Sequence, residues 1–206
     1  MSTDLLHTPL GSLPVAAIDF ESAGAAPGET DCPVQVGMVR VDSLTGELRR
    51  EHCYCSYIAP THPVHWSAAK VHGITTEMLA GAPSFVSLWP ELKQRLSGCA
   101  VIGHNPATEQ RFLRAFPGHG FGPWADTLQL ARQALPQLPD HSLSTVCDAL
   151  GLTAELTDLL PGRRWHDALY DAAASLLLLR FLVRALHMEA VPFSAVALKE
   201  KLKFEG

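Results

Sequence analysis

The sequence predicts an α/β fold with a central mixed five-stranded sheet flanked by helices. Three strand-like runs come first, over residues 14–20, 34–39 and 47–58, and their short connections predict an antiparallel meander. Helical and strand-like segments then alternate, which favours one mixed sheet covered by helices. The chain of 206 residues is long enough to bury its own core, so we expect one domain.

The first three strands are read from apolar patterns. PVAAIDF is short and mostly apolar, as expected of a buried strand. A loop rich in Gly, Ala and Pro follows over residues 23–33. The second strand alternates apolar side chains at Val34, Val36 and Met38, and a turn at residues 45–46 leads into the third strand.

Two further strands alternate with helices in the second half. A helix begins at Ser84, and its apolar residues recur every three to four positions at Phe85, Leu88, Leu92 and Leu96. Residues 99–103 predict a fourth strand, after which Asn105 caps a helix whose first residue is Pro106. A fifth, short strand within residues 124–130 enters another helix.

The last two helices are bounded by clear signals. Ser142 can cap a helix that Gly151 ends, and a final long helix runs from about Asp167 to about His187. We find no internal repeat and no linker that would split the chain.

Composition excludes some classes of protein. The net charge of −5 argues against a protein that holds nucleic acid by a large basic surface, although bound metals would let an enzyme grip one strand end. The N-terminus lacks a secretory signal, and Arg180 and Arg184 interrupt the most apolar segment, so no membrane span is expected. We therefore expect a cytoplasmic protein.

Five cysteines occur at spacings unlike a disulfide framework. Cys53 and Cys55 alternate on the third strand and would share one face, so a zinc pair is one interpretation. No second pair stands at ligand spacing, and small buried side chains in a reducing compartment explain the cysteines better.

Acidic residues lie in or beside apolar elements at three distant points. Asp19 and Glu21 are two apart on a strand, so both project from one face and repel each other unless a proton or cation intervenes. A solvated strand end is the alternative. Glu109 heads an apolar helical stripe with Phe112, Leu113 and Phe116, and its alternative role is to serve the start of its helix.

The third point is the start of the final helix. Asp171 shares a face with small residues that would allow close approach to the sheet. His166 is five residues earlier, about 140° around an ideal helix, so the two cannot share a face if both are helical. If Asp167 is the N-cap, His166 lies on the preceding loop, where it suits a general base; plain surface is the alternative.

Four acids and a histidine match the needs of phosphodiester cleavage by two metal ions. Carboxylates can hold two hard cations such as Mg²⁺ or Mn²⁺ about 3.5–4 Å apart. A histidine with an ordinary pKa of about 6.5 can accept the proton of an attacking water at neutral pH.

Three segments carry these residues: AIDFES (17–22), GHNPATEQRFL (103–113) and HDALYDA (166–172). In order and spacing they resemble the Asp-x-Glu, His-Asn-x-x-x-Asp and His-x-x-x-x-Asp motifs of the DEDDh branch of the DnaQ-like 3′–5′ exonucleases, which have a ribonuclease H-like fold. PVQVG (33–37), VHGIT (71–75), DTLQLAR (126–132) and HSLSTVCDALGL (141–152) also resemble family segments, as do Arg163 and Arg164.

The resemblance implies a role for each matching residue. Asp19, Glu21 and Asp171 would bind the first metal, Asp19 and Glu109 the second, and His166 would be the base. Four residues would contact the 3′-terminal nucleotide: Phe20, Ser22, His72 and Asn105. Asp126 also resembles a family residue, but helix capping or packing explains it equally well.

The resemblance also implies domain limits and a reaction. We expect an extension over residues 1–13, an exonuclease domain over 14–188 and a tail over 189–206. The expected activity is a metal-dependent 3′–5′ exonuclease that prefers DNA, with single-stranded 3′ ends as substrate. Two departures from the family are Ser22 at a usual Thr and Glu109 at a usual Asp, which puts the affinity for the second metal in doubt.

Two alternatives remain at this point. One is an exoribonuclease of the same family, and the other is a catalytically impaired module that binds nucleic acid. The sequence does not decide between a polymerase partner, self-association and neither.

Overall fold

The computed structural model describes residues 2–199 and has the expected mixed five-stranded sheet, with strand order β3-β2-β1-β4-β5. β1, β2 and β3 form the antiparallel meander, and β4 and β5 run parallel to β1. The strands are β1 Val15–Ser22, β2 Pro33–Val41, β3 Cys53–Tyr57, β4 Ala100–Gly103 and β5 Trp124–Asp126. β1 is therefore the central strand of the sheet.

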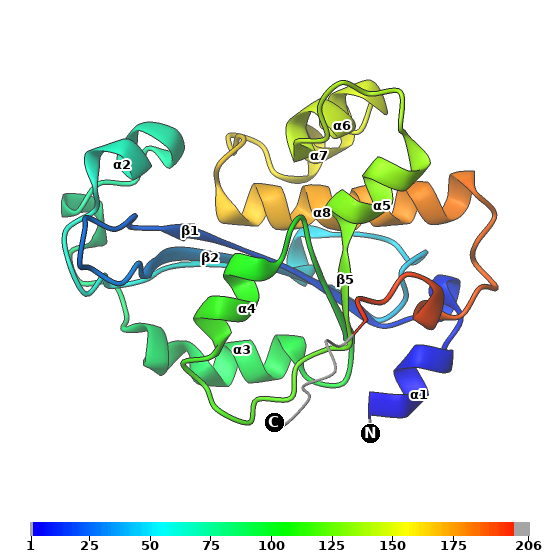
Figure 1. The fold of residues 1–206 in the computed structure, drawn as a ribbon, viewed down its shortest axis with the longest axis horizontal. Helices are drawn as coiled ribbons and strands as arrows, with labels where there is room; N and C mark the ends of the chain where they lie inside the picture. Colours follow the sequence, from blue (N-terminus) through cyan, green and yellow to red (C-terminus); the bar gives the residue numbers. More distant parts are fainter. Residues whose placement is uncertain (1, 200–206) are drawn as a thin grey trace.

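Helices cover both faces of this sheet (Figure 1). The long helix α8 crosses one face, with α5, α6 and α7 beyond it, and α3 and α4 cover the other face. The helices are α1 Ser2–His7, α2 Trp66–His72, α3 Trp89–Leu96, α4 Ala107–Leu113, α5 Thr127–Ala134, α6 Leu143–Ala149, α7 Thr153–Leu159 and α8 Ala168–Ala185. Short 3₁₀ turns are η1 Leu10–Ser12, η2 Arg50–His52, η3 Glu77–Leu79, η4 Phe85–Leu88 and η5 Phe193–Ala195.

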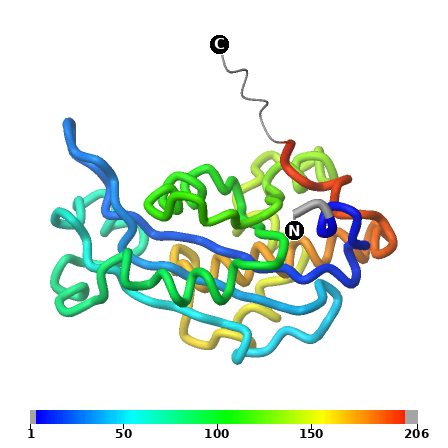
Figure 2. Tube along the Cα trace, turned by 90° about the horizontal axis from the view of Figure 1, so that it is seen from below, coloured from blue at the N-terminus to red at the C-terminus, as the bar shows by residue number. Residues whose placement is uncertain are grey.

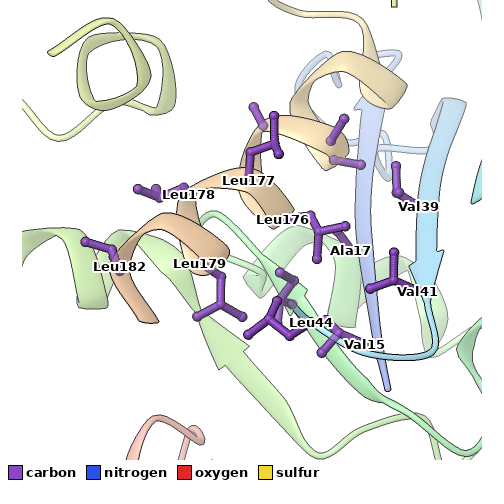
Figure 3. Close-up of a cluster of buried hydrophobic side chains, with 14 of the residues drawn as sticks. Val15, Ala17, Val39, Val41, Leu44, Leu176, Leu177, Leu178, Leu179 and Leu182 are labelled. Carbon is purple, nitrogen blue, oxygen red and sulfur yellow. The ribbon is translucent and has the colours of Figure 1, made fainter. Parts of the chain in front are cut away.

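The alternation of side chains along β1 divides the interior into two cores. Val15 and Ala17 face α8, where they pack with leucines of that helix (Figure 3). Ala16, Ile18 and Phe20 face α3 and α4 instead. Because all three alanine and valine positions before Ile18 are fully buried, β1 is apolar on both faces at its start.

Helix α8 lies unusually close to the sheet at its N-terminal end. A Cβ built on Gly37 of β2 would lie 2.2 Å from the backbone of Ala168, so only glycine fits there. The small side chains at Ala172, Ala173 and Ala174 are fully buried in the core on this side of the sheet. Gly37 thus sets how near the first turn of α8 comes to β1 and β2.

Three boundaries differ from the sequence prediction. The third strand begins at Cys53 rather than residue 47, because residues 50–52 form η2. The helix expected from Ser84 is split into η4 and α3, because Pro90 lacks an N–H and fits only the first turn of an α-helix. Asn105 has a φ of 65° and is not the N-cap of α4; Pro106 holds that position.

The two ends of the described chain meet at one side of the domain (Figure 2). Pro9 and Pro192 form an antiparallel bridge, and Leu10 and Phe193 are fully buried in the α8-side core. Ala197 forms a further bridge with Ala125 of β5. Within residues 2–199 no helix combines the length and apolar character needed to cross a membrane.

Candidate active site

The candidate active site lies along the part of β1 that pairs with β2 but no longer with β4. β4 pairs with β1 only along Val15–Ala17, whereas β2 continues beside β1 to Ser22. The second half of β1 therefore has an edge that β4 does not cover. Asp19 and Glu21 lie on this half.

Both carboxylates project toward the α8 face, as the period of two predicted. Asp19 lies opposite Gly37 and Glu21 lies opposite Gln35 in the antiparallel register. Gln35 Oε1 accepts a hydrogen bond of 3.0 Å from the N–H of Ala168, the first residue of α8. This contact places the start of α8 directly over the two acids.

The start of α8 carries Asp171 in its first turn. Asp167 is the N-cap, as predicted, and its Oδ1 accepts hydrogen bonds from the N–H groups of Leu169 (3.1 Å) and Tyr170 (3.3 Å). Asp171 Oδ2 accepts a hydrogen bond of 3.2 Å from the N–H of His166. Its other oxygen, Oδ1, is buried and has no partner within the described residues.

His166 lies on the loop before the N-cap, where the sequence analysis placed it. Its backbone is left-handed, with a φ of 64°, and its side chain is exposed. One ligand atom from each of Glu21, His166 and Asp171 lies within 4.8 Å of the others. Two segments that are separated by about 140 residues of chain thus meet at one point.

Glu109 reaches the same acids from the other side of the sheet. It is only 5% exposed on α4, and the backbone of Phe20, between Asp19 and Glu21, favours the charged form of its carboxylate. Among the charged groups, Glu109 contributes most to the raised pKa of Asp19. The structure therefore brings the four predicted carboxylates together.

The four carboxylates hold their protons unusually strongly. Burial, followed by the charges of Glu109 and Asp171, raises the pKa of Asp19 well above its ordinary value. Burial, the largest cause, raises the pKa of Glu21, Glu109 and Asp171 to about 7 in each case. Repulsion among neighbouring acids adds to this effect.

A bound divalent cation would offset both the desolvation of the charged carboxylates and the repulsion among them. Hard cations such as Mg²⁺ and Mn²⁺ bind carboxylate oxygens, and a buried acid cluster offers several of them. The unpartnered Oδ1 of Asp171 supplies a free acceptor beside Glu21. The residues present therefore fit a divalent metal ion.

The four residues expected to contact the terminal nucleotide do not lie together in one place. The Phe20 side chain is 6% exposed and packs edge-on against Phe85 and Phe112, away from the carboxylates. His72 Nδ1 accepts from the N–H of Ile74 (3.0 Å), so Nε2 carries the proton and donates to the Ser22 carbonyl (3.1 Å).

His72 and Ser22 thus lie together at the end of β1, with both His72 nitrogens occupied. Asn105 is exposed and lines a separate groove beside α4 and α5. Contacts of these residues with a nucleotide stay a prediction.

Asp126 is a capping residue, which was one of its two expected roles. Its Oδ1 accepts hydrogen bonds of 2.9 Å from the N–H groups of Leu128 and Asn105. The second of these bonds holds Asn105 in its left-handed conformation at the end of β4. This contact was not expected from the sequence, because it joins residues that are 21 positions apart.

A polar network behind His166 was also missed. Arg163 Nη1 lies 2.6 Å from both oxygens of Asp167, and Gln35 Nε2 lies 3.4 Å from Asp167 Oδ2. The spacing of Arg163 and Asp167, four residues apart, was the available signal. Asp167 is a fifth carboxylate near the site, and its charge raises the pKa of Glu21.

Cys55 belongs to this network and not to a zinc site. Its Sγ lies 3.5 Å from Gln35 Nε2 and from Arg163 Nη1. Among residues 2–199, the one group of three or more His, Cys, Asp and Glu residues with metal-ligand spacing is Glu21, His166 and Asp171. Burial raises the pKa of the Cys53 and Cys55 thiols, which disfavours thiolate ligands.

Comparisons with known proteins point to one family. The sequence profile of the RNase_T family, described as exonuclease, matches residues 16–179. A DNA polymerase III subunit epsilon-like protein of Rhodobacter capsulatus is 29% identical over 175 residues, or 83% of this chain and 24% of that protein. A PolC-type DNA polymerase III of Thermotoga maritima is 30% identical over 199 residues, or 94% of this chain and 13% of that protein. The chain spans less than a quarter of the length of these two relatives.

Solved structures share the fold. Exonuclease X in complex with 5′ overhanging duplex DNA superposes with a TM-score of 0.70 at 23% identity, covering 88% of this chain and 98% of that one. The nuclease domain of 3′hExo, a DEDDh family member bound to rAMP, superposes with a TM-score of 0.67 at 16% identity, covering 92% and 97%. The expected ribonuclease H-like fold is confirmed. The chain belongs to the RNase_T exonuclease family, the DnaQ-like 3′–5′ exonucleases whose motifs it carries.

Proposed function

We propose that this protein is a metal-dependent exonuclease that hydrolyses phosphodiester bonds from the 3′ ends of nucleic acids. The observation that carries the proposal is the convergence of four carboxylates, one buried and three half-buried, and one exposed histidine at the open edge of β1. Membership of an exonuclease family supports the same reaction. A structural role gives no reason to gather acids whose mutual repulsion raises their pKa values.

The acids divide into two overlapping sets of ligands. Asp19, Glu21 and Asp171 would hold one Mg²⁺ or Mn²⁺ ion, and Asp19 and Glu109 would hold a second. When bound, the ions would lower the pKa of an attacking water and stabilise the charge that develops on the leaving oxygen. The chain's own contribution is to fix the acids on three rigid elements, β1, α4 and α8.

His166 is the proposed general base. Its exposed imidazole lies beside Glu21 and Asp171, within reach of a water at the acid cluster. The hydrogen bond from its own N–H to Asp171 and the N-cap at Asp167 hold the loop in place. The imidazole would accept the proton of the attacking water and release it to solvent.

DNA is the proposed substrate. The relatives that match the sequence include DNA polymerase III proteins, and the structure of exonuclease X contains DNA. RNA is the alternative, which the nucleotide bound to 3′hExo favours. The structure of this chain alone shows no side chain committed to a 2′-hydroxyl.

The test is digestion of DNA and RNA oligonucleotides of identical sequence, labelled at the 5′ end, with Mn²⁺ or with EDTA. We expect a ladder that shortens from the 3′ end, only with metal, and faster on DNA. Equal or faster turnover of RNA would refute the DNA preference. Intact 3′ ends in the presence of Mn²⁺, together with retained binding, would identify a binding module instead.

The position of Glu109 argues against the impaired module. The extra methylene of glutamate does not carry the carboxylate out of the cluster, because the charge of Glu109 acts on Asp19 and its own pKa responds to the backbone of Phe20. The carboxyl group that the family places at this position is therefore retained.

A further inference from the structure

The loop before α8 holds His166 in a conformation that needs support from its surroundings. His166 has a φ of 64°, in the left-handed region that is uncommon for residues with a Cβ. Its side chain is exposed, so packing around the imidazole does not fix the loop. The hydrogen bond from its N–H to Asp171 is one restraint, and the others must come from neighbouring residues.

Asp167, which follows His166, makes the contacts that fix this loop. Its Oδ1 caps α8 through the N–H groups of Leu169 and Tyr170. Both of its oxygens also lie 2.6 Å from Nη1 of Arg163, four residues earlier in the loop. The side chains of Arg163 and Asp167 are 33% and 23% exposed, so this ion pair is half-buried. The pair closes the loop on itself, with His166 inside the closed segment.

Gln35 of β2 ties the closed loop to the sheet. Gln35 is 3% exposed, its Oε1 accepts a hydrogen bond from the N–H of Ala168, and its Nε2 lies 3.4 Å from Asp167 Oδ2. The residue opposite Gln35 in the strand register is Glu21. Arg163, Asp167 and Gln35 therefore connect the loop that carries His166 to the pair of strands that carries the acids.

We propose that Arg163 is a positioning residue for the general base, and that it holds the imidazole of His166 beside Glu21 and Asp171 by pairing with Asp167. The inference rests on the proposed function, in which His166 accepts the proton of the attacking water. The guanidinium also offsets the charge of Asp167, so a carboxylate can anchor the loop without adding an unpaired negative charge beside the acid cluster.

The first test measures kcat and KM on a thymidine dodecamer labelled at its 5′ end, with Mn²⁺. Arg163→Ala should lower kcat about 10- to 100-fold with little change in KM, because a base that is not held in place accepts the proton less often. Calorimetric titration should show that Mn²⁺ binds no more weakly than in the wild type, because the charge of Asp167 is then left unpaired and attracts cations.

Three further variants show whether the ion pair is the cause. Arg163→Lys keeps a cation for Asp167 and should recover part of the lost kcat, whereas Arg163→Met keeps only the apolar stem and should not. Arg50→Ala is the matched control, because Arg50 donates to the carbonyls of Asp158 and Leu159 at the end of α7. It should leave kcat unchanged. An Arg163→Met variant as fast as Arg163→Lys would overturn the inference.

A double variant separates positioning from direct contact with the substrate. If Arg163 acts through His166, then Arg163→Ala should lower kcat no further in a protein that already carries His166→Ala. Arg163 also borders a pocket next to His166, so contact between its guanidinium and a phosphate of the substrate is the alternative. Losses that multiply in the double variant, or a rise in KM at unchanged kcat in Arg163→Ala, would overturn the inference.

The second test does not depend on activity. In the metal-free protein, the amide hydrogens of His166 and Ala168 should exchange faster in Arg163→Ala than in the wild type, as followed by NMR. Their exchange should be unchanged in Arg50→Ala. Equal exchange in Arg163→Ala and the wild type would overturn the inference. If the wild type leaves the dodecamer intact, the exonuclease proposal fails, and the exchange rates alone decide whether Arg163 holds the loop.

Discussion

The two halves of β1 have the same neighbour on one side and different neighbours on the other. Val15–Ala17 lies between β2 and β4, and its side chains are fully buried in apolar cores. From Asp19 onward only β2 is paired, and carboxylates from β1, α4 and α8 gather at the open edge. The first half of β1 thus contributes to the stability of the core, and its second half carries the acidic site. The boundary between the two halves is the point where the pairing with β4 ends.

Helix α8 repeats this division. Its first turn carries Asp171 and is followed by fully buried alanines, and Gly37 of β2 allows this end of the helix to lie close to the sheet. Its later turns carry leucines that fill the core against the first half of β1 (Figure 3). The apolar later turns of α8 therefore hold its first turn, with Asp171, in position. Substitutions in the apolar halves of β1 and α8 should lower stability, whereas substitutions in the acidic halves should lower activity.

The largest effect is expected at Asp19, which both proposed metal sites share. Asp19→Asn should lower kcat/KM by about 10⁴-fold or more, because no other acid can bridge the two sites. The same change removes a carboxyl group whose charged form is disfavoured by desolvation and by its acidic neighbours, so urea unfolding of the metal-free protein should show equal or higher stability.

Val15→Ala is the matched control in the other half of the strand. It should lower the free energy of unfolding by about 1–3 kcal/mol, because it leaves a cavity in a closed core. Activity per folded molecule should stay near wild type. Equal loss of activity in both variants would mean that the two halves are not functionally distinct.

His166→Ala tests the base. We expect kcat to fall about 10²–10⁴-fold at neutral pH, since a general base contributes about that much. Calorimetric titration with Mn²⁺ should still detect binding, because the four carboxylates remain. A variant with near wild-type kcat would show that another group takes the proton.

Gly37→Ala should disrupt the close contact between β2 and the start of α8, and so affect both stability and activity. A methyl group at Gly37 would collide with the backbone of Ala168, so the start of α8 must move away from β1. Overpacking of this kind costs about 1–3 kcal/mol, and we expect the upper end from thermal unfolding. Activity should also fall because Asp171 moves with the helix. Unchanged stability and activity would contradict the close contact.

The sequence was sufficient for the sheet, for the face that Asp19 and Glu21 share, and for the N-cap at Asp167. Each of these follows from local spacing within one element. It was insufficient for Asn105, whose left-handed backbone depends on a hydrogen bond to Asp126 from a different strand. The need for glycine at position 37 could not be predicted from the sequence either. Gly37 leaves room for the backbone of Ala168, which is 131 positions away in the chain. Contacts between distant elements set these features, and no local pattern encodes them.

A smaller effect is expected from pH. The pKa of Glu109 is about 7 in the folded protein and is close to 4.5 when the carboxyl is not perturbed, so the folded state binds the proton more tightly. Stability of the metal-free protein should therefore fall as pH rises from about 4.5 to about 7, by on the order of 2–3 kcal/mol for this group.

Glu109→Gln isolates this contribution. Urea unfolding in EDTA should show similar stability for both proteins near pH 5 and a more stable variant near pH 7.5. Added Mn²⁺ at pH 7.5 should stabilise the wild type more than the variant. A wild type that gains stability steadily between these pH values would contradict the raised pKa.

Glu109→Asp should have the smallest effect, because it keeps the charge and removes one methylene group. The shorter side chain leaves a small gap at this buried position on α4, which costs about 1 kcal/mol of stability. We expect kcat/KM to stay within about tenfold of wild type or to rise, since a carboxylate that binds metal through a water tolerates the change. Complete loss, measured beside Asp19→Asn under the same conditions, would show that the open half of β1 is built around the longer side chain. The reason would then be the reach of the longer side chain, which lets a carboxylate on α4 act on Asp19 of the strand whose edge β4 leaves open.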